Sequence, residues 1–270
     1  MIYIPRLLES KLQKLVLESG KAIILYGPRQ VGKTTLVKSV LANLSLRTLE
    51  INCDEQRYID TLSSADGRKL KELVEGYDLL FVDEAQRVKN IGLSLKILID
   101  QATKLKIIVT GSSSLELASG VPEPLTGRKW TYNLFPVSQQ ELRALYNPFE
   151  LKEQLGERLV WGSYPEIFRL KGVETKAKYL AELSTDYLYK DIFKLVNIRN
   201  PDKIRNLLKL IAFQVGSEVS LNELGNSLDM SKETVARYID LLKKNFILFE
   251  LSPLSRNLRK EVTKTKKYYF

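Results

Sequence analysis

The sequence predicts an α/β fold in which helices cover both faces of a parallel sheet. Short apolar runs of strand length alternate with stretches of helical periodicity through the first 110 residues. Strands that alternate with helices in this way are typical of parallel sheets buried on both faces. The expected strands lie near 22–26, 47–52, 79–83 and 106–110. The expected helices lie near 34–43, 66–75 and 92–103, preceded by an amphipathic helix from Arg6 to Ser19.

A glycine-rich segment follows the first expected strand. Residues Gly27 to Thr34 match the phosphate-binding loop pattern G-x-x-x-x-G-K-[ST] without a substitution, between a strand and a helix as the motif requires. Glycines let the backbone curl so that successive N–H groups face one anion, and the helix N-terminus adds positive potential. The alternative is a glycine-rich turn before an ordinary helix. The expected nucleotide-binding residues are Gly27, Pro28, Arg29, Gln30, Val31, Gly32, Lys33, Thr34 and Thr35.

Two carboxylates end a later apolar run. Leu79 to Val82 predicts a buried strand, and Asp83 and Glu84 follow it directly. Ligands bind at the carboxyl ends of such strands, so we expect Asp83 to hold Mg²⁺ together with the Thr34 hydroxyl. Lys33 is expected at the β- and γ-phosphates, and Glu84 is expected to activate a water molecule. The Asp-Glu order favours hydrolysis over phosphoryl transfer to a second substrate.

A serine run follows the strand expected at 106–110. We expect Ser112 to sense the γ-phosphate from the tip of this strand, with Thr110 as the second candidate. A serine of this run that caps a helix beginning at Leu115 is an equal alternative.

The amino-acid composition excludes several kinds of catalytic site and structural feature. The chain has no histidine, which excludes Ser-His-Asp and Cys-His hydrolysis and His-ligated zinc. Its single cysteine, Cys53, excludes an internal disulfide and favours a reducing cytoplasm. No apolar run approaches the ~18 residues that a membrane span needs. The net charge of +10 suggests an anionic partner such as nucleic acid without establishing one.

The pattern changes after the expected sheet. An alternating strand is expected over 130–135, and a capped helix is expected to begin at Ser138. Residues from about 150 to 215 are mostly helical in pattern, with long helices over 177–195 and 204–215. We therefore expect an ATPase core over 1–147, a helical lid over 148–200 and a third unit over 201–270.

The third unit has the layout of a winged helix, a helix-turn-helix module with a β-hairpin. A short helix over 221–228, a tight turn and a second helix capped by Ser231 precede strands expected at 246–251 and 267–270. Basic residues on the second helix and in the loop between the strands are suited to DNA phosphates. The alternative is a module that serves as a lid or docks protein. The DNA-binding candidates are Lys232, Thr234, Arg237, Arg256, Arg259, Lys260 and Lys264.

These motifs together resemble a known family. The chain is similar to AAA+ type ATPases of archaea and bacteria that join an ATPase core to a winged helix, distant kin of the origin-recognition-like initiators. The resemblance is greatest to the group that carries a C-terminal nuclease-like domain. It rests on residues 27–34, 81–86, 109–113, 125–128, 162–166 and 231–242.

The resemblance implies properties that the residues alone do not. Arg128 is implied to act as an arginine finger on the γ-phosphate of a neighbouring subunit, which makes a homo-oligomer a candidate assembly. The bound nucleotide is implied to be ATP, in line with the missing N-K-x-D segment that would select guanine. In the group the segment matching 267–270 continues into the nuclease-like domain, so we expect the third unit to be truncated at its C-terminal end. A D…ExK cluster for nuclease activity is not found in the sequence.

The leading hypothesis is an Mg²⁺-dependent ATPase that acts as a switch or motor on double-stranded DNA. The alternative is a regulatory nucleotide-binding protein with slow turnover, whose winged helix docks protein. A small-molecule kinase is disfavoured because a winged helix has no role in one.

Overall fold

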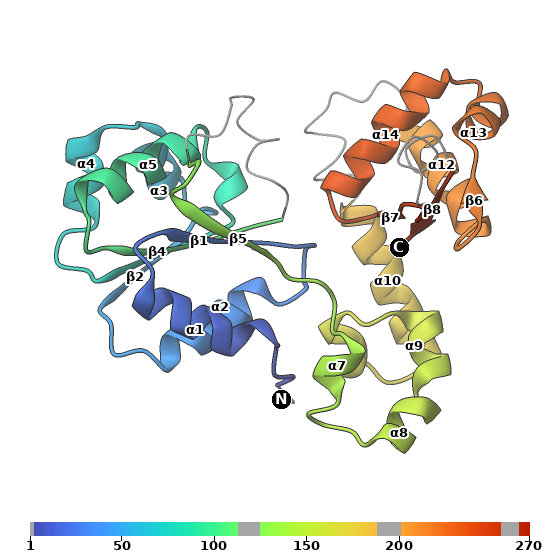
Figure 1. Ribbon diagram of the computed structural model, residues 1–270, viewed down its shortest axis with the longest axis horizontal. Coiled ribbons are helices and arrows are strands. Elements are labelled where there is room, and N and C mark those ends of the chain that lie inside the picture. The colour runs from blue at the N-terminus through green and yellow to red at the C-terminus, as the bar shows by residue number, and fades with distance from the viewer. Residues whose placement is uncertain (1–2, 113–124, 188–200, 255–264) are drawn as a thin grey trace. The chain divides into compact units, whose positions relative to one another are not determined.

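The computed structural model describes residues 3–112, 125–187, 201–254 and 265–270 of the 270-residue chain (Figure 1). The chain divides into two compact units, Met1–Leu183 and Ser184–Phe270. Within the described ranges, no helix is long and apolar enough to cross a membrane.

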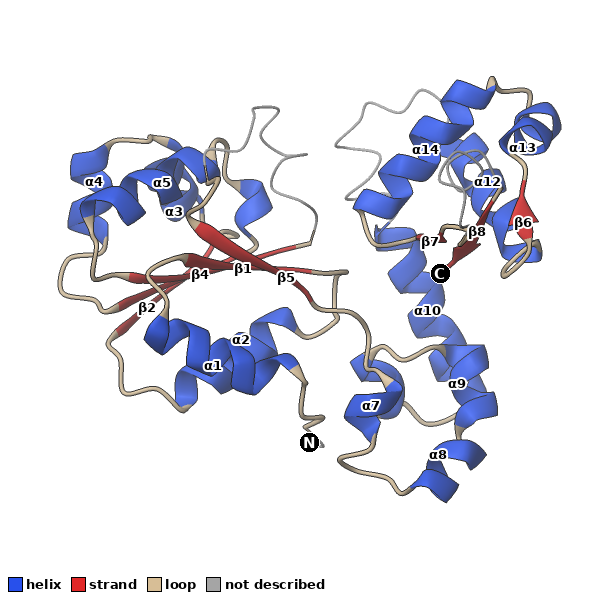
Figure 2. Cartoon of the chain, in the orientation of Figure 1, coloured by secondary structure: helices blue, strands red, loops and turns tan. Residues whose placement is uncertain are grey.

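A five-stranded parallel sheet with the order β2-β3-β4-β1-β5 forms the centre of the first unit (Figure 2). Its strands are β1 (Ala22–Tyr26), β2 (Thr48–Asn52), β3 (Leu79–Asp83), β4 (Lys106–Gly111) and β5 (Lys129–Asn133). The three inner strands are almost wholly buried, as their continuous apolar sequences predict, whereas the edge strands β2 and β5 are partly exposed. The strand expected over 130–135 ends at Asn133, although the Leu134 N–H still donates to the Tyr26 carbonyl at 2.7 Å.

Helices cover both faces of this sheet, which confirms the predicted fold class. Helices α1 (Leu8–Glu18) and α2 (Lys33–Ala42) lie on one face, and α3 (Gln56–Ser63), α4 (Gly67–Leu73) and α5 (Ile91–Gln101) lie on the other (Figure 1). Leu12 and Val16 of α1 pack with Val37 and Val40 of α2 in the core beneath the sheet. Helix α3 was not among the expected elements.

The remainder of the first unit is helical, as expected. It contains α7 (Gln139–Leu142), α8 (Pro148–Glu153), α9 (Leu155–Trp161), the 3₁₀ turn η2 (Pro165–Phe168) and most of α10 (Val173–Tyr187), whose last four residues belong to the second unit. The predicted cap at Ser138 is confirmed: its side chain accepts the Glu141 N–H, and the Glu141 carboxylate accepts the Ser138 N–H. The helix expected over 177–195 can be followed as α10 to Tyr187, since 188–200 lie outside the described residues.

In residues 201–254 and 265–270, the greater part of the described second unit, three helices pack against a small antiparallel sheet. The helices are α12 (Pro201–Phe213), α13 (Leu221–Leu228) and α14 (Lys232–Lys244), and β6 (Glu218–Val219), β8 (Lys266–Tyr269) and β7 (Phe249–Leu251) form the sheet in that order. The strand expected from residue 246 begins only at Phe249. Phe246 has a left-handed φ of 59°, and the Ile247 N–H returns to the Leu242 carbonyl, so these residues end α14. The two-residue strand β6 was too short to predict.

Candidate functional site

The glycine-rich segment forms a tight loop between β1 and α2. Gly27 lies so close to the end of β5 that a Cβ atom there would be 2.1 Å from the Leu134 carbonyl oxygen. Gly32, the N-cap of α2, has a φ of 95°, a conformation that L side chains rarely adopt. Both glycines are therefore required by the local backbone, and the loop presents the N-terminus of α2 as an anion site.

The lysine of the motif is buried against its own loop. Lys33 is 5% exposed, and its Nζ donates to the carbonyl oxygens of Gly27 at 2.9 Å and Pro28 at 2.8 Å. These bonds hold an ammonium charge against the backbone of the loop. The arrangement concentrates positive potential where phosphate oxygens bind such loops.

The structure brings Thr34 and Asp83 together. The Thr34 hydroxyl donates to Asp83 Oδ2 at 2.7 Å. Strand β4 lies between β1 and β3, so Thr110 near its carboxyl end reaches the same carboxylate, and its hydroxyl donates to Asp83 Oδ1. Mg²⁺ commonly takes one or two protein oxygen ligands beside phosphate and water, so the Thr34 and Asp83 oxygens fit that ion.

Glu84 sits at the edge of this cluster in an unusual backbone conformation. Its φ is 55°, in the left-handed region that non-glycine residues rarely enter, and its N–H lies 3.2 Å from Asp83 Oδ1. The Glu84 carboxylate accepts a hydrogen bond of 2.5 Å from Gln86 Nε2. Strained residues of this kind cluster at functional sites.

Gln86 was not among the predicted site residues. Its side chain joins the end of β3 to the tip of β4, because Gln86 Oε1 accepts the Ser112 N–H at 3.3 Å. Ser112 is buried, and this contact involves its backbone. The two sensor candidates differ in what they contact. The Thr110 hydroxyl donates to Asp83, whereas the contact described for Ser112 is made by its backbone N–H. The helix start expected at Leu115 lies outside the described residues.

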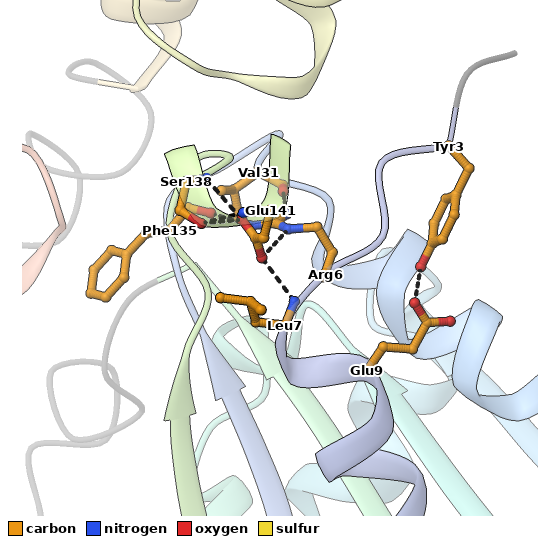
Figure 3. Close-up of polar contacts among 8 residues, drawn as sticks. All are labelled: Tyr3, Arg6, Leu7, Glu9, Val31, Phe135, Ser138 and Glu141. Atoms are coloured by element: carbon orange, nitrogen blue, oxygen red, sulfur yellow. Dashed lines mark hydrogen bonds and ion pairs between the residues drawn. The ribbon is translucent and has the colours of Figure 1, made fainter. Parts of the chain in front are cut away.

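A buried ion pair lies behind the phosphate loop (Figure 3). Arg6 Nε contacts Glu141 Oε1 at 2.9 Å, and both side chains are 6% exposed. The other guanidinium nitrogens donate to the carbonyl oxygens of Val31 at 2.9 Å and Phe135 at 2.5 Å. Arg6 therefore ties the N-terminal segment, the phosphate loop, the exit of β5 and helix α7 to one point.

Glu141 is held as a carboxylate by several donors. It accepts the Leu7 N–H at 3.0 Å, and the Ser138 N–H and hydroxyl at 2.8 and 3.1 Å. Burial alone raises the pKa of Glu141, but the hydrogen bonds from Ser138, Arg6 and Leu7 and the charge of Arg6 outweigh it and lower the pKa. No local pattern indicated this pair, because its members are 135 residues apart in the chain.

A cavity of about 550 Å³ opens beside the loop, within the range of small-molecule sites. Gly32 and Thr35 line it from the phosphate loop and the start of α2. Ile4, Val137 and Phe168 supply apolar walls from the N-terminal segment, the residues after β5, and η2. A nucleotide whose phosphates occupy the loop therefore has an adjoining space for its nucleoside.

The structure does not bring Arg128 to this site. Its carbonyl oxygen accepts the N–H of Ala22, the first residue of β1, whereas the phosphate loop follows Tyr26, the last. Its guanidinium pairs with Asp100 at 2.8 Å. Arg128 thus lies at the amino-terminal ends of the strands, whereas the phosphate loop of the same chain lies at their carboxyl ends.

Three of the DNA-binding candidates can be placed. Lys232 and Arg237 are exposed on α14, and the partly exposed Thr234 lies in its first turn, where its N–H donates to the capping Ser231 hydroxyl at 3.2 Å. Arg237 also lies over the Tyr238 ring. The other candidates, Arg256, Arg259, Lys260 and Lys264, lie outside the described residues.

Comparisons with known proteins divide the chain in two. Residues 19–143 match the AAA domain family, and residues 152–270 match a domain of unknown function, DUF8612. An uncharacterised protein of Methanocaldococcus jannaschii is 30% identical over 305 residues, covering 98% of this chain and 63% of that protein. One of Mycobacterium tuberculosis is 28% identical over 257 residues, covering 94% and 54%. The chain thus spans just over half the length of these relatives.

Solved structures include one that is similar over nearly all of this chain. A Walker-type ATPase of Pyrococcus abyssi superposes with a TM-score of 0.65 at 19% identity, covering 98% of this chain and 93% of that one. With the AAA match, this likeness identifies the fold of the first unit as that of the P-loop NTPases.

Proposed function

We propose that this chain binds ATP and hydrolyses it with Mg²⁺. The observation that carries the proposal is the convergence of the phosphate loop with Thr34, Asp83, Thr110 and Glu84 at one edge of the sheet. Phosphoryl transfer to water needs only positioning and charge stabilisation, which this set of groups can supply without histidine.

Each residue has a separate task in this proposal. The loop amides and Lys33 bind the β- and γ-phosphates, and Thr34 and Asp83 hold Mg²⁺, which neutralises phosphate charge when bound. Glu84 orients the attacking water and accepts its proton. Thr110 fixes the Asp83 carboxylate through its hydroxyl, and Ser112 remains the proposed sensor at the tip of β4.

The nucleoside is proposed to occupy the cavity between the phosphate loop and the helical segment. The apolar walls formed by Ile4, Val137 and Phe168 suit a purine ring. Adenine rather than guanine is proposed because the chain has no N-K-x-D segment after its third strand in sequence.

The second unit is proposed to be a winged helix that contacts double-stranded DNA. The turn between α13 and α14, the cap at Ser231 and the exposed Lys232 and Arg237 support this assignment. Residues 201–270 contain 13 Lys+Arg and 8 Asp+Glu, a difference of +5, which favours phosphate contacts. ATP turnover is then proposed to switch or drive this contact.

Arg128 is proposed to act on the nucleotide of a neighbouring copy. Arg128 lies at the amino-terminal ends of the strands, away from the phosphate loop of its own chain, and its partly exposed side chain pairs with Asp100. We therefore propose that it reaches the phosphate loop of a neighbouring copy. Exchange of the Asp100 carboxylate for a γ-phosphate would supply transition-state charge stabilisation.

The test is Mg²⁺-dependent ATP hydrolysis with and without double-stranded DNA, beside Glu84→Gln. Turnover that DNA stimulates and that Glu84→Gln lowers to a residual rate, roughly a hundredfold or more below the wild type, supports the proposal. DNA affinity should fall as salt rises. Tight ATP binding without turnover in the wild-type chain refutes the proposed hydrolysis. Turnover without salt-dependent DNA binding refutes the DNA role and favours a winged helix that docks protein.

A further inference from the structure

We propose that Gln86 is the residue that positions Glu84 for hydrolysis and couples it to the tip of β4. This inference rests on the proposed ATPase function. Gln86 Nε2 donates to Glu84 Oε2 at 2.5 Å, and Gln86 Oε1 accepts the Ser112 N–H at 3.3 Å. One side chain thus bridges the proposed water-activating carboxylate and the strand that holds the proposed sensor.

The two neighbours of the Gln86 amide leave it one orientation. A backbone N–H can only donate, and a carboxylate can only accept. The amide oxygen must therefore face Ser112, and the NH₂ group must face Glu84. The bond to the carboxylate is charge-assisted, which makes it the stronger of the two.

The backbone around Gln86 is fixed independently of this contact. Glu84 enters the 3₁₀ turn η1 (Ala85–Arg87) from its left-handed conformation, and the Arg87 N–H closes the turn on the Glu84 carbonyl at 3.1 Å. Ala85 is fully buried, and the Arg87 guanidinium pairs with Asp54 at 2.8 Å. Gln86 therefore projects from an anchored turn, and its amide restricts where the Glu84 carboxylate can lie.

This geometry has a consequence for catalysis. With one Glu84 oxygen held by Gln86, the other oxygen is the one that orients the water. A shift of the β4 tip moves the Ser112 N–H, then the Gln86 amide, and so the carboxylate. Gln86 does not contact the nucleotide in this scheme, so it acts on the rate of the chemical step and not on nucleotide affinity.

Two substitutions of Gln86 test the bridge: one removes only the contact with Glu84, and the other removes both contacts. Gln86→Glu is nearly isosteric and keeps an acceptor for the Ser112 N–H, but it faces Glu84 with a second acceptor. Gln86→Leu removes both contacts. Each is expected to lower kcat by roughly ten- to hundredfold, the worth of one hydrogen bond to a charged group, with the ATP KM and Kd within about twofold of wild type.

The decisive comparison uses Glu84→Gln as the background. If Gln86 acts through Glu84, the double variant Glu84→Gln/Gln86→Leu turns over no more slowly than Glu84→Gln alone, since residues that act as a unit are not additive. The matched control is Gln56→Leu. Gln56 makes a similar amide–carboxylate contact of 2.8 Å to Asp60 on the exposed surface of α3, so its loss should leave kcat unchanged.

Several results would overturn the inference. Wild-type kcat in either Gln86 variant, a raised KM at unchanged kcat, or a further multiplicative loss in the double variant each contradicts it. Turnover that is lost in Glu84→Gln but normal in the Gln86 variants refutes the role of Gln86 and leaves the ATPase proposal standing. No turnover in the wild-type chain refutes both.

Discussion

Replacing Glu141 by alanine removes the anionic half of the ion pair behind the phosphate loop. The Arg6 guanidinium would keep its bonds to Val31 and Phe135 but lose its counter-charge in a site where it is 6% exposed. The N–H groups of Leu7 and Ser138 would lose their acceptor at the same time.

The magnitude follows from this geometry. Breaking a buried pair by removing one partner costs about 3–5 kcal/mol, because a buried charge is left uncompensated. Glu141→Ala is therefore expected to lower the free energy of unfolding of the first unit by about 3–5 kcal/mol.

The chain contains a matched control for this measurement. Glu150 occupies the same capping-box position on α8, where its carboxylate accepts the Asn147 N–H at 2.8 Å, but it is exposed and no arginine contact of its carboxylate is found in the described residues. Glu150→Ala should cost about 1 kcal/mol or less. Urea unfolding followed by tryptophan fluorescence measures both variants, since Trp130 and Trp161 lie in the first unit. Equal losses of unfolding free energy in Glu141→Ala and Glu150→Ala would show that the buried pair with Arg6 adds no stability beyond a helix cap.

Three further predictions concern single positions. The pKa of Glu141 is lower in the folded chain than its ordinary 4.5, so the unfolded chain takes up a proton at this residue first as the pH falls. The stability that the ionised Glu141 contributes is therefore complete above about pH 4.5 and is lost below that pH. The urea midpoint of the wild type should fall more steeply below about pH 4.5 than the midpoint of Glu141→Gln. Gly27→Ala should abolish measurable ATP binding in a titration, since its Cβ would be 2.1 Å from the Leu134 carbonyl oxygen, whereas Gly156→Ala, where a Cβ meets nothing within 4 Å, should bind normally. Ser231→Ala should destabilise the second unit by about 1 kcal/mol in circular dichroism melts, because it removes the cap of α14; an unchanged melt would contradict the cap.

The sequence predicted the centre of the fold because local patterns determine it. The continuous apolar runs of β1, β3 and β4 predicted buried strands, and the glycine-rich loop indicated the ends of the strands at which the site forms. Asp83 could be placed beside Thr34 for the same reason, since the carboxyl ends of parallel strands share one edge.

What the sequence did not predict depends on contacts between distant segments. Arg6 and Glu141 are each ordinary charged residues in their local sequence, and only the folded chain makes them a buried pair. Gln86 lies in one of the segments that carry the resemblance, but its role could not be predicted because it requires the neighbouring tip of β4. The late start of β7 follows from the left-handed Phe246, which a propensity for strand could not reveal.

The loop around Lys33 is proposed to bind ATP, and Glu84 is proposed to be needed for ATP hydrolysis. The most direct test is equilibrium titration of ATP with Mg²⁺ into the wild-type chain, Lys33→Ala and Glu84→Gln. We expect Glu84→Gln to bind ATP as tightly as the wild type. Lys33→Ala, which loses the ammonium bound to the loop carbonyls, should bind ATP at least about tenfold more weakly. ATP affinity that is equal in Lys33→Ala and the wild type would show that this loop is not the ATP site.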